Sequence, residues 1–195
     1  MLTNVMGLSR SRVVLALAIA VVAFAFTGAS AQITYNAVLT GPNEDPPNGS
    51  PATGTATVEV DAISHTLHIV VNFSGLVANS TIAHIHAPTT TPGTGTAAPA
   101  TTTPTLPGFP AGVTSGSYDM VLFLTQESTY STDFFNANGQ SVGQAEAALL
   151  QALAEGRAYF NVHSDTYPGG EIRGFLTNSV PVEDTTWGKV KSLYR

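Results

Sequence analysis

The residues best suited to chemistry in this sequence are three histidines, His84, His86 and His163. His84 and His86 are separated by one residue, Ile85. Successive side chains of a β-strand point to opposite faces, so both imidazoles would project from one face, roughly 7 Å apart along the strand. Imidazole nitrogens are good ligands for copper and zinc. We therefore predict that these two histidines, joined by His163 from a neighbouring strand, hold one metal ion. The alternative is that each histidine only bonds to a nearby carbonyl.

The residues around His163 add three candidates to this site. Asn161 and Glu171 are the expected hydrogen-bonding partners that would orient the metal ligands. Glu171 and Arg173 share one strand face by alternation, either as an anion-guiding pair beside the histidines or as an ion pair that closes the domain. The remaining histidines, His65 in a turn and His68 on the polar side of a strand, are expected to be exposed and not to bind metal.

Alternating apolar and polar residues predict most of the elements that must position these side chains. A hairpin is expected where two such runs flank the turn at 61–64. The predicted strands are residues 33–39, 54–60, 67–73, 82–87, 117–125, 158–164 and 172–176. Seven or eight strands at this spacing indicate an all-β fold, an antiparallel β-sandwich or Greek-key barrel.

Two segments depart from the strand pattern. Residues 143–155 carry apolar side chains at helical spacing, with Gly156 in the position of a C-cap, so they predict one short helix. Residues 88–116 are rich in Thr, Pro, Gly and Ala and almost without charge, which predicts a mobile loop. Because this loop starts directly after His86, a lid over the histidines is the alternative.

The chain begins with the features of a secretory signal peptide over residues 1–31. Arg10 and Arg12 provide a basic start, an apolar run of 14 residues follows at 13–26, and the small residues at 29–31 match a cleavage site. The apolar run is shorter than the ~20 residues that a membrane-spanning helix needs. We predict cleavage and export, with the protein secreted, periplasmic or at the cell surface, and no membrane span afterwards.

Residues 32–178 are expected to form one domain, because the chain is too short for two comfortable ones. After the predicted leader, five basic residues face 13 acidic ones. This acidity argues against nucleic acid and anionic membrane surfaces as partners. The sequence has no cysteine, which excludes disulfides, thiol catalysis and thiolate metal sites.

Residues 179–195 differ in character from the domain. They contain three of the five basic residues that follow the leader, together with Trp187, Val190 and Tyr194 at the spacing of one helix face. This C-terminal tail is either a docking segment for a protein partner or a frayed end.

Several motifs, in this order, resemble the CHRD domain family, which was named from chordin and is common in exported microbial proteins. They are residues 39–47 (LTGPNEDPP), 54–56 (GTA), 83–86 (AHIH), 156–163 (GRAYFNVH) and 168–174 (PGGEIRG). The resemblance covers about residues 34–176. It implies an all-β extracellular domain, usually without an assigned activity. In chordin the domain belongs to a protein that binds growth factors.

The histidine pattern is also similar, more distantly, to copper/zinc superoxide dismutase. This resemblance implies His84, His86 and His163 as copper ligands and Arg173 as a catalytic residue that guides the superoxide anion. The chain lacks a bridging histidine after His86, a His-rich zinc loop and a cysteine pair. A single metal ion is therefore the most that the resemblance implies.

Three functions follow from these observations. The first is a non-catalytic extracellular CHRD module whose three histidines hold one copper or zinc ion. The second is a superoxide dismutase-like copper oxidoreductase that uses Arg173. The third is an adhesion or matrix-binding module in which the histidines are structural and no metal is bound.

Overall fold

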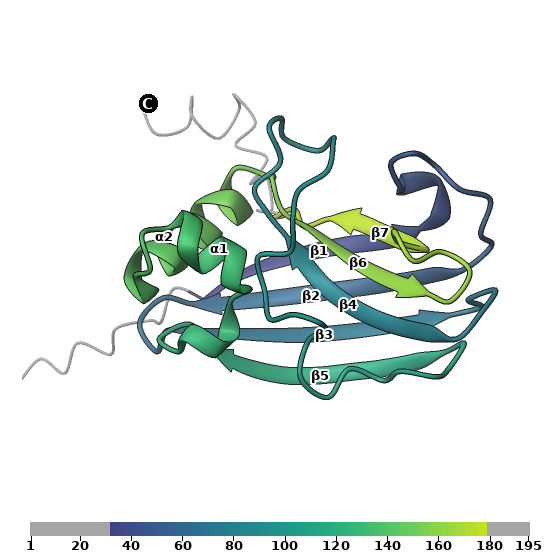
Figure 1. Cartoon of the computed structure of the whole chain (residues 1–195), viewed down its shortest axis with the longest axis horizontal. Coiled ribbons are helices and arrows are strands. Elements are labelled where there is room, and N and C mark those ends of the chain that lie inside the picture. The colour runs from purple at the N-terminus through teal and green to yellow at the C-terminus, as the bar shows by residue number, and fades with distance from the viewer. Residues whose placement is uncertain (1–31, 179–195) are drawn as a thin grey trace, which may run out of the picture.

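The fold is one antiparallel sheet, seen in a computed structural model that describes residues 32–178. Seven strands follow the order β4-β6-β7-β1-β2-β3-β5 (Figure 1). They are β1 (Gln32–Thr40), β2 (Thr53–Asp61), β3 (Thr66–Ser74), β4 (Ser80–His86), β5 (Gly116–Phe123), β6 (Tyr159–Ser164) and β7 (Ile172–Phe175). The predicted all-β, antiparallel class is confirmed. The predicted leader at 1–31 and tail at 179–195 lie outside the described residues.

The hairpin of β2 and β3 shows how local sequence sets the register. Asp61 accepts hydrogen bonds from the backbone N–H groups of Ile63 (2.8 Å) and Ser64 (3.1 Å), which tightens the turn. His65 completes it with a φ of 54°. Val60 then pairs with Leu67 across the hairpin, and both side chains are buried. The hairpin expected at this turn is confirmed.

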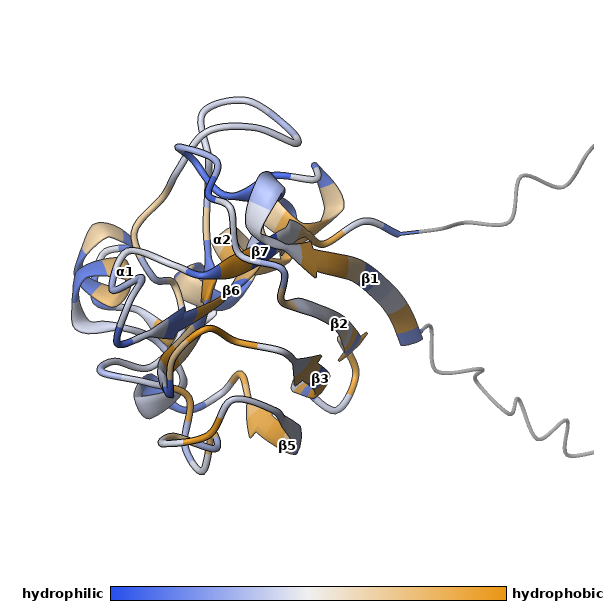
Figure 2. Cartoon of the chain, turned by 90° about the vertical axis from the view of Figure 1, so that its right-hand side faces the viewer, coloured by the Kyte–Doolittle hydropathy of each residue, from blue (hydrophilic) through white to orange (hydrophobic). Residues whose placement is uncertain are grey.

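The sheet curls around a single hydrophobic core, and strands β1, β2, β3 and β5 follow a curved arc in Figure 2. Helix α2 (Val142–Ala154) buries Leu149 and Leu153 in this core. Gly156, just beyond its C-cap, has a φ of 65°. This helix corresponds to the predicted helix at 143–155. Helix α1 (Thr132–Ala137) was not predicted, because six residues are too few to show a helical pattern.

Two short 3₁₀ helices complete the regular elements, η1 (Gly41–Asn43) after β1 and η2 (Glu127–Thr129) before α1. The first of them belongs to a set of loops that cover the outer face of β4, β6 and β7. By contrast, the outer face of β1, β2, β3 and β5 is open, and Val38 on that face is 65% exposed. The covered face buries polar side chains on the side of the sheet opposite the core.

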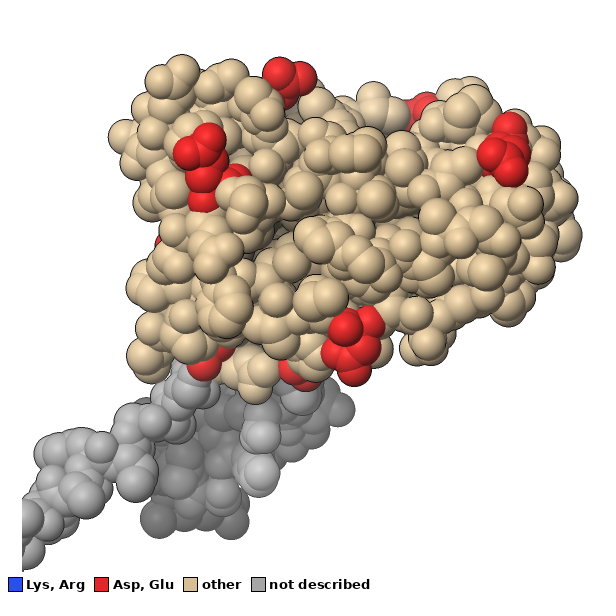
Figure 3. All heavy atoms as spheres, turned by 60° about the horizontal axis from the view of Figure 1, so that its bottom comes forward, with Lys and Arg blue, Asp and Glu red and all other residues tan. Residues whose placement is uncertain are grey.

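The surface of the described part is acidic. Residues 32–178 contain only two basic residues, Arg157 and Arg173, and Arg173 is buried. The face in Figure 3 accordingly carries Asp and Glu side chains but no Lys or Arg. None of the helices within residues 32–178 has the length and apolar character needed to cross a bilayer.

Candidate metal centre

Pairing between β4 and β6 brings the three predicted metal ligands together. His84 lies opposite Asn161 and His86 lies opposite Tyr159 in this antiparallel ladder. His163 follows Asn161 by two residues, so it projects from the same face as the other two histidines. All three side chains are buried beneath the covering loops. We call His84, His86 and His163 the histidine trio.

Each ring of the histidine trio makes one hydrogen bond to a backbone carbonyl. His84 uses Nε2 toward Pro104 (2.7 Å), and His86 uses Nδ1 toward Ala97 (2.8 Å). His163 uses Nδ1 toward the carbonyl of Pro168 (2.9 Å). A carbonyl oxygen only accepts, so each of these ring nitrogens is the protonated donor. In the neutral imidazole the other nitrogen then carries a free lone pair.

The second nitrogens of the trio are the unusual feature of this site. His84 Nδ1, His86 Nε2 and His163 Nε2 are all buried and have no hydrogen-bond partner. Each histidine offers one ring nitrogen as a ligand atom, and these three nitrogens lie within 4.8 Å of one another. Nitrogens that share one ion at ~2.0–2.1 Å lie at most about 4 Å apart, so small ring rotations would complete a metal site. Buried polar atoms without partners are rare in proteins and are destabilising unless a ligand satisfies them.

Burial keeps the histidine trio neutral. Loss of solvent lowers the pKa of His84 to about 4, although its bond to Pro104 opposes the shift. The same cause lowers the pKa of His86 to about 3, and the charge of Arg173 contributes. The pKa of His163 is also lowered by burial. Neutral imidazoles with free lone pairs are the form that binds metal ions.

The rings pack against one another and against one aromatic neighbour. The ring centroids of the trio are 5.5 Å apart for His84 and His86, 5.6 Å for His84 and His163, and 5.9 Å for His86 and His163. Tyr159 stacks on His86 with centroids 4.8 Å apart and planes 6° apart. Its position opposite His86 in the ladder explains this contact, which sequence reasoning missed because it requires the strand register.

The Thr/Pro-rich segment 88–116 is bound along the edge of β4, which differs from the mobile loop that we expected. The backbone N–H of Ala100 bonds to the carbonyl of Ile85 (2.9 Å), and that of Leu106 bonds to the carbonyl of Ala83 (3.1 Å). Ala100 and Leu106 are fully buried. Composition alone was misleading here. The segment has few apolar residues, but its backbone hydrogen bonds to the free edge of β4 hold it in place.

Arg173 lies beside the trio and is held in place by the loops. Its Nε donates to the carbonyl of Asn43 and its Nη1 to the carbonyl of Gly95 (3.1 Å). The guanidinium carbon is 4.8 Å from the ring centroid of Tyr159, and Nε is 3.9 Å from a carboxylate oxygen of Glu44. A pocket of about 440 Å³ is lined by Asn43, Glu44, Asp45, Pro47, Gly93, Thr94, Arg173 and Phe175.

Asn161 and Glu171 do not contact the histidines as hydrogen-bond partners, contrary to expectation. Backbone carbonyls take that role, as described above. Glu171 accepts bonds from the Ser50 hydroxyl (2.6 Å) and the Val77 N–H (2.7 Å), which tie three distant segments together. No ion pair joins Glu171 and Arg173 within the described residues; Arg173 faces Glu44 instead. The carbonyl partners of the histidines are backbone groups that the loops bring next to the rings. Every residue has a carbonyl, so residue types could not identify these partners.

Glu44 is a second buried group that sequence reasoning missed. Burial raises its pKa to about 7, while the charge of Arg173 and a hydrogen bond from Asn161 oppose the shift. Its Oε1 has no hydrogen-bond partner. Glu44 lies within the LTGPNEDPP motif, whose place next to Arg173 depends on the pairing of Thr40 in β1 with Arg173 in β7.

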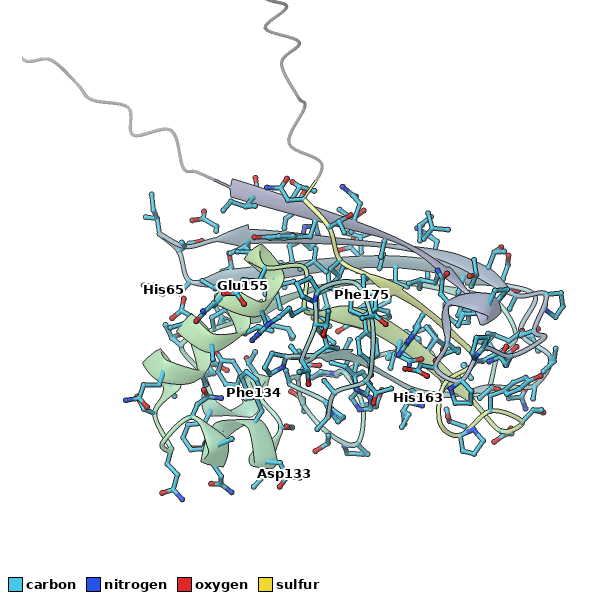
Figure 4. The ribbon with its side chains drawn as sticks, turned by 90° about the horizontal axis from the view of Figure 1, so that it is seen from above. His65, Asp133, Phe134, Glu155, His163 and Phe175 are labelled. Carbon is cyan, nitrogen blue, oxygen red and sulfur yellow. The ribbon has the colours of Figure 1, made fainter. Side chains whose placement is uncertain are left out.

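The other two histidines lie outside the trio, as expected. His65 bonds to Glu146 (2.7 Å), and its side chain is 49% exposed. His68 lies between Glu59 (3.1 Å) and Asp119 (2.7 Å) with a side chain that is 32% exposed. Figure 4 places His65 and His163 toward opposite ends of the molecule.

Comparison with known proteins gives one result that bears on this site. The model of the CHRD domain family matches residues 35–176. This range includes all three histidines and the whole sheet except the first residues of β1. Neither the curated proteins nor the solved structures that were compared gave a match. The family match spans most of the chain and agrees with the motifs that suggested it. The chain belongs to the CHRD domain family.

Proposed function

We propose that this chain is an exported, non-catalytic CHRD module that holds one copper or zinc ion through His84, His86 and His163. The single observation that carries the proposal is the set of three buried ring nitrogens without hydrogen-bond partners. A bound ion would satisfy all three at once. If the histidines had a purely structural role, these three nitrogens would remain buried without a hydrogen-bond partner.

The hydrogen bonds on the far side of each ring support this proposal. Metal-binding histidines usually donate their other N–H to a carbonyl or carboxylate, which fixes the tautomer and the ring orientation. The trio has three such bonds, to Ala97, Pro104 and Pro168. Nitrogen donors favour copper and zinc, whereas calcium and magnesium prefer oxygen.

Metal analysis of the purified chain tests the proposal. Metal-free protein is incubated with copper or zinc, freed of excess metal, and analysed for bound ion per chain. We expect one ion per wild-type chain and none in the His84→Ala/His86→Ala variant. The matched control is His65→Ala/His68→Ala, which removes two histidines outside the trio. Circular dichroism of each variant checks that the sheet is retained.

The third function, an adhesion or matrix-binding module, is the other outcome of the same experiment. If wild-type protein retains no more ion than the His84→Ala/His86→Ala variant, the histidines are structural. The proposal would then be wrong.

Export is the other half of the proposal and has its own test. The apolar leader at 1–31 and membership of the CHRD family support it. Expression of the full chain should release a protein whose N-terminus is Gln32, which N-terminal sequencing would detect. Retention of the leader on an intracellular product would contradict export.

A copper oxidoreductase is the second candidate, and Arg173 is the observation that favours it. Burial is the main cause of the lowered pKa of His86, and the charge of Arg173 adds to it, so Arg173 acts electrostatically on this one member of the trio. Its guanidinium also lines a pocket of about 440 Å³ that contains none of the three histidines, and a small anion bound there would lie beside Arg173. Superoxide dismutation by copper-loaded protein, reduced at least roughly tenfold in Arg173→Gln, would support this function. Copper-loaded protein without turnover would exclude it.

A further inference from the structure

We infer that the histidine trio selects a monovalent ion, Cu⁺, over the divalent ions Zn²⁺ and Cu²⁺. This inference rests on the proposed function, because it names the ion that the same three histidines hold. It follows from three properties of the site: the charge of its donors, their number, and their burial.

The donors of the trio are neutral and only three in number. Each imidazole has one N–H committed to a carbonyl, so each offers a single neutral lone pair. Within residues 32–178, no carboxylate and no fourth histidine joins the group within the same 4.8 Å. A bound ion would therefore keep its whole charge inside the protein and would have three protein ligands.

The neighbouring carboxylates are not ligands of the trio. Glu44 faces Arg173, and one oxygen of Glu171 accepts bonds from Ser50 and Val77. The other oxygen of each is buried without a hydrogen-bond partner, but neither carboxylate joins the trio within 4.8 Å. Arg173 is itself a fixed positive charge, because two carbonyls hold its guanidinium. The cost of removing an ion from water grows with the square of its charge, so a divalent ion loses about four times as much as a monovalent one.

Burial also limits a fourth ligand from solvent. His84, His86 and His163 are 2%, 7% and 6% exposed, and their unpartnered nitrogens are enclosed. Zn²⁺ in structural sites takes four protein ligands, and in catalytic sites with three protein ligands a water molecule supplies the fourth. Cu²⁺ favours a tetragonal set of four or more ligands. Cu⁺ has a filled d shell and is stable with two or three nitrogen ligands, which is what the trio offers.

Competition titrations of the full chain compare the ions directly. Cu⁺ is supplied anaerobically with a reductant and bicinchoninate as the competing chelator. Zn²⁺ is supplied with a chromophoric zinc chelator at the same pH. We expect one Cu⁺ per chain with a dissociation constant at least roughly a hundredfold below that of Zn²⁺. X-ray absorption of the copper form should show Cu⁺ with three nitrogen neighbours.

The outcomes separate this inference from the proposed function. Zn²⁺ that binds at the trio as tightly as Cu⁺, or a four-coordinate copper, would overturn the inference and leave the metal-binding function intact. Failure of both ions to bind would overturn both.

An isosteric variant tests the charge argument. Asn161 lies opposite His84 and two residues before His163. Asn161→Asp therefore places a carboxyl group on the same strand face with almost no change of size, in place of the amide that hydrogen-bonds to Glu44. We expect this variant to strengthen Zn²⁺ binding by about tenfold and Cu⁺ binding by less. The preference of the trio for Cu⁺ over Zn²⁺ would then be smaller than in the wild-type protein. His68→Gln is the control and should leave the ratio unchanged. An unchanged ratio in a folded Asn161→Asp protein would contradict the charge argument.

Discussion

The five histidines of this chain divide into two groups with opposite chemistry. The trio is buried, and each ring donates to a backbone carbonyl while its second nitrogen has no partner. His65 and His68 are at least partly exposed and bond to carboxylates. Burial lowers the pKa values of the trio, whereas hydrogen bonds to Asp119 and Glu59 raise that of His68. The same side chain thus favours a metal ion in the trio and a proton at His68.

In both groups the hydrogen-bond partner of the ring matters as much as the histidine itself. A carboxylate partner adds charge and favours the imidazolium, which cannot bind a metal. A carbonyl partner orients the ring without adding a charge, and leaves the neutral form with one free lone pair. Four changes test this contrast. Two alter metal binding and come first, and two depend on pH; within each pair the larger effect precedes the smaller.

Loss of one ligand should have the largest effect. An ion that binds only the folded protein stabilises it by about 2.7 kcal/mol when present at 100 times its dissociation constant. We expect copper or zinc to raise the melting temperature of wild-type protein and of His68→Ala, but not of His163→Ala. Thermal unfolding with and without metal measures this. An equal rise in His163→Ala would show that the ion binds elsewhere.

Removal of the carbonyl partners should have the next largest effect. Replacing residues 96–105 by a short Gly/Ser linker removes the carbonyls that hold His84 and His86, while all three ligands remain. Loss of such orienting bonds typically weakens metal binding by roughly 10–100-fold. Metal competition measures the change, and the fold is checked by circular dichroism. Unaltered affinity would mean that the segment only covers the site.

Acid should destabilise the metal-free protein through the trio. Because the folded pKa values are lowered to about 4 for His84 and about 3 for His86, stability is present above pH 6.5 and is lost as the pH falls toward those values. The loss is about 1.4 kcal/mol per pH unit for each histidine that must take up a proton. Denaturant unfolding from pH 7 to 4 should show a flatter dependence in His84→Gln/His86→Gln. The same slope in both proteins would contradict this account.

His68 should show the opposite sign and a smaller effect. Its pKa is raised by the hydrogen bonds to Asp119 and Glu59, so its contribution is present below pH 6.5 and disappears as the pH rises through its folded pKa. Exposed pairs of this kind contribute at most about 1 kcal/mol. Wild-type protein and His68→Gln should therefore differ more in stability at pH 5.5 than at pH 8.5. A larger difference at pH 8.5 would reverse the sign and refute the assignment.

The sequence was sufficient for part of this site. Alternation placed His84 and His86 on one face, and the residue pattern around His163 marked it as the third member of the trio. Side-chain period is a local property of a strand, so it can be read from consecutive residues. The antiparallel class followed from the same property repeated along the chain.

Other features needed contacts between distant segments. The pairing of β4 with β6 decides that Tyr159 stacks on His86, and the pairing of Thr40 with Arg173 decides that Glu44 faces that arginine. The carbonyl partners arise from where loops cross the sheet, so no residue type marks them. The segment 88–116 was misjudged for a related reason: its order comes from backbone bonds to β4, which composition does not encode.

The most direct test of the trio as a metal centre is a crystal structure of the metal-loaded chain, with anomalous scattering collected at the absorption edge of the ion. We predict one anomalous peak at ~2.0–2.1 Å from His84 Nδ1, His86 Nε2 and His163 Nε2. A trio without a peak in protein soaked with copper and zinc, or a peak only at His65 or His68, would contradict the account.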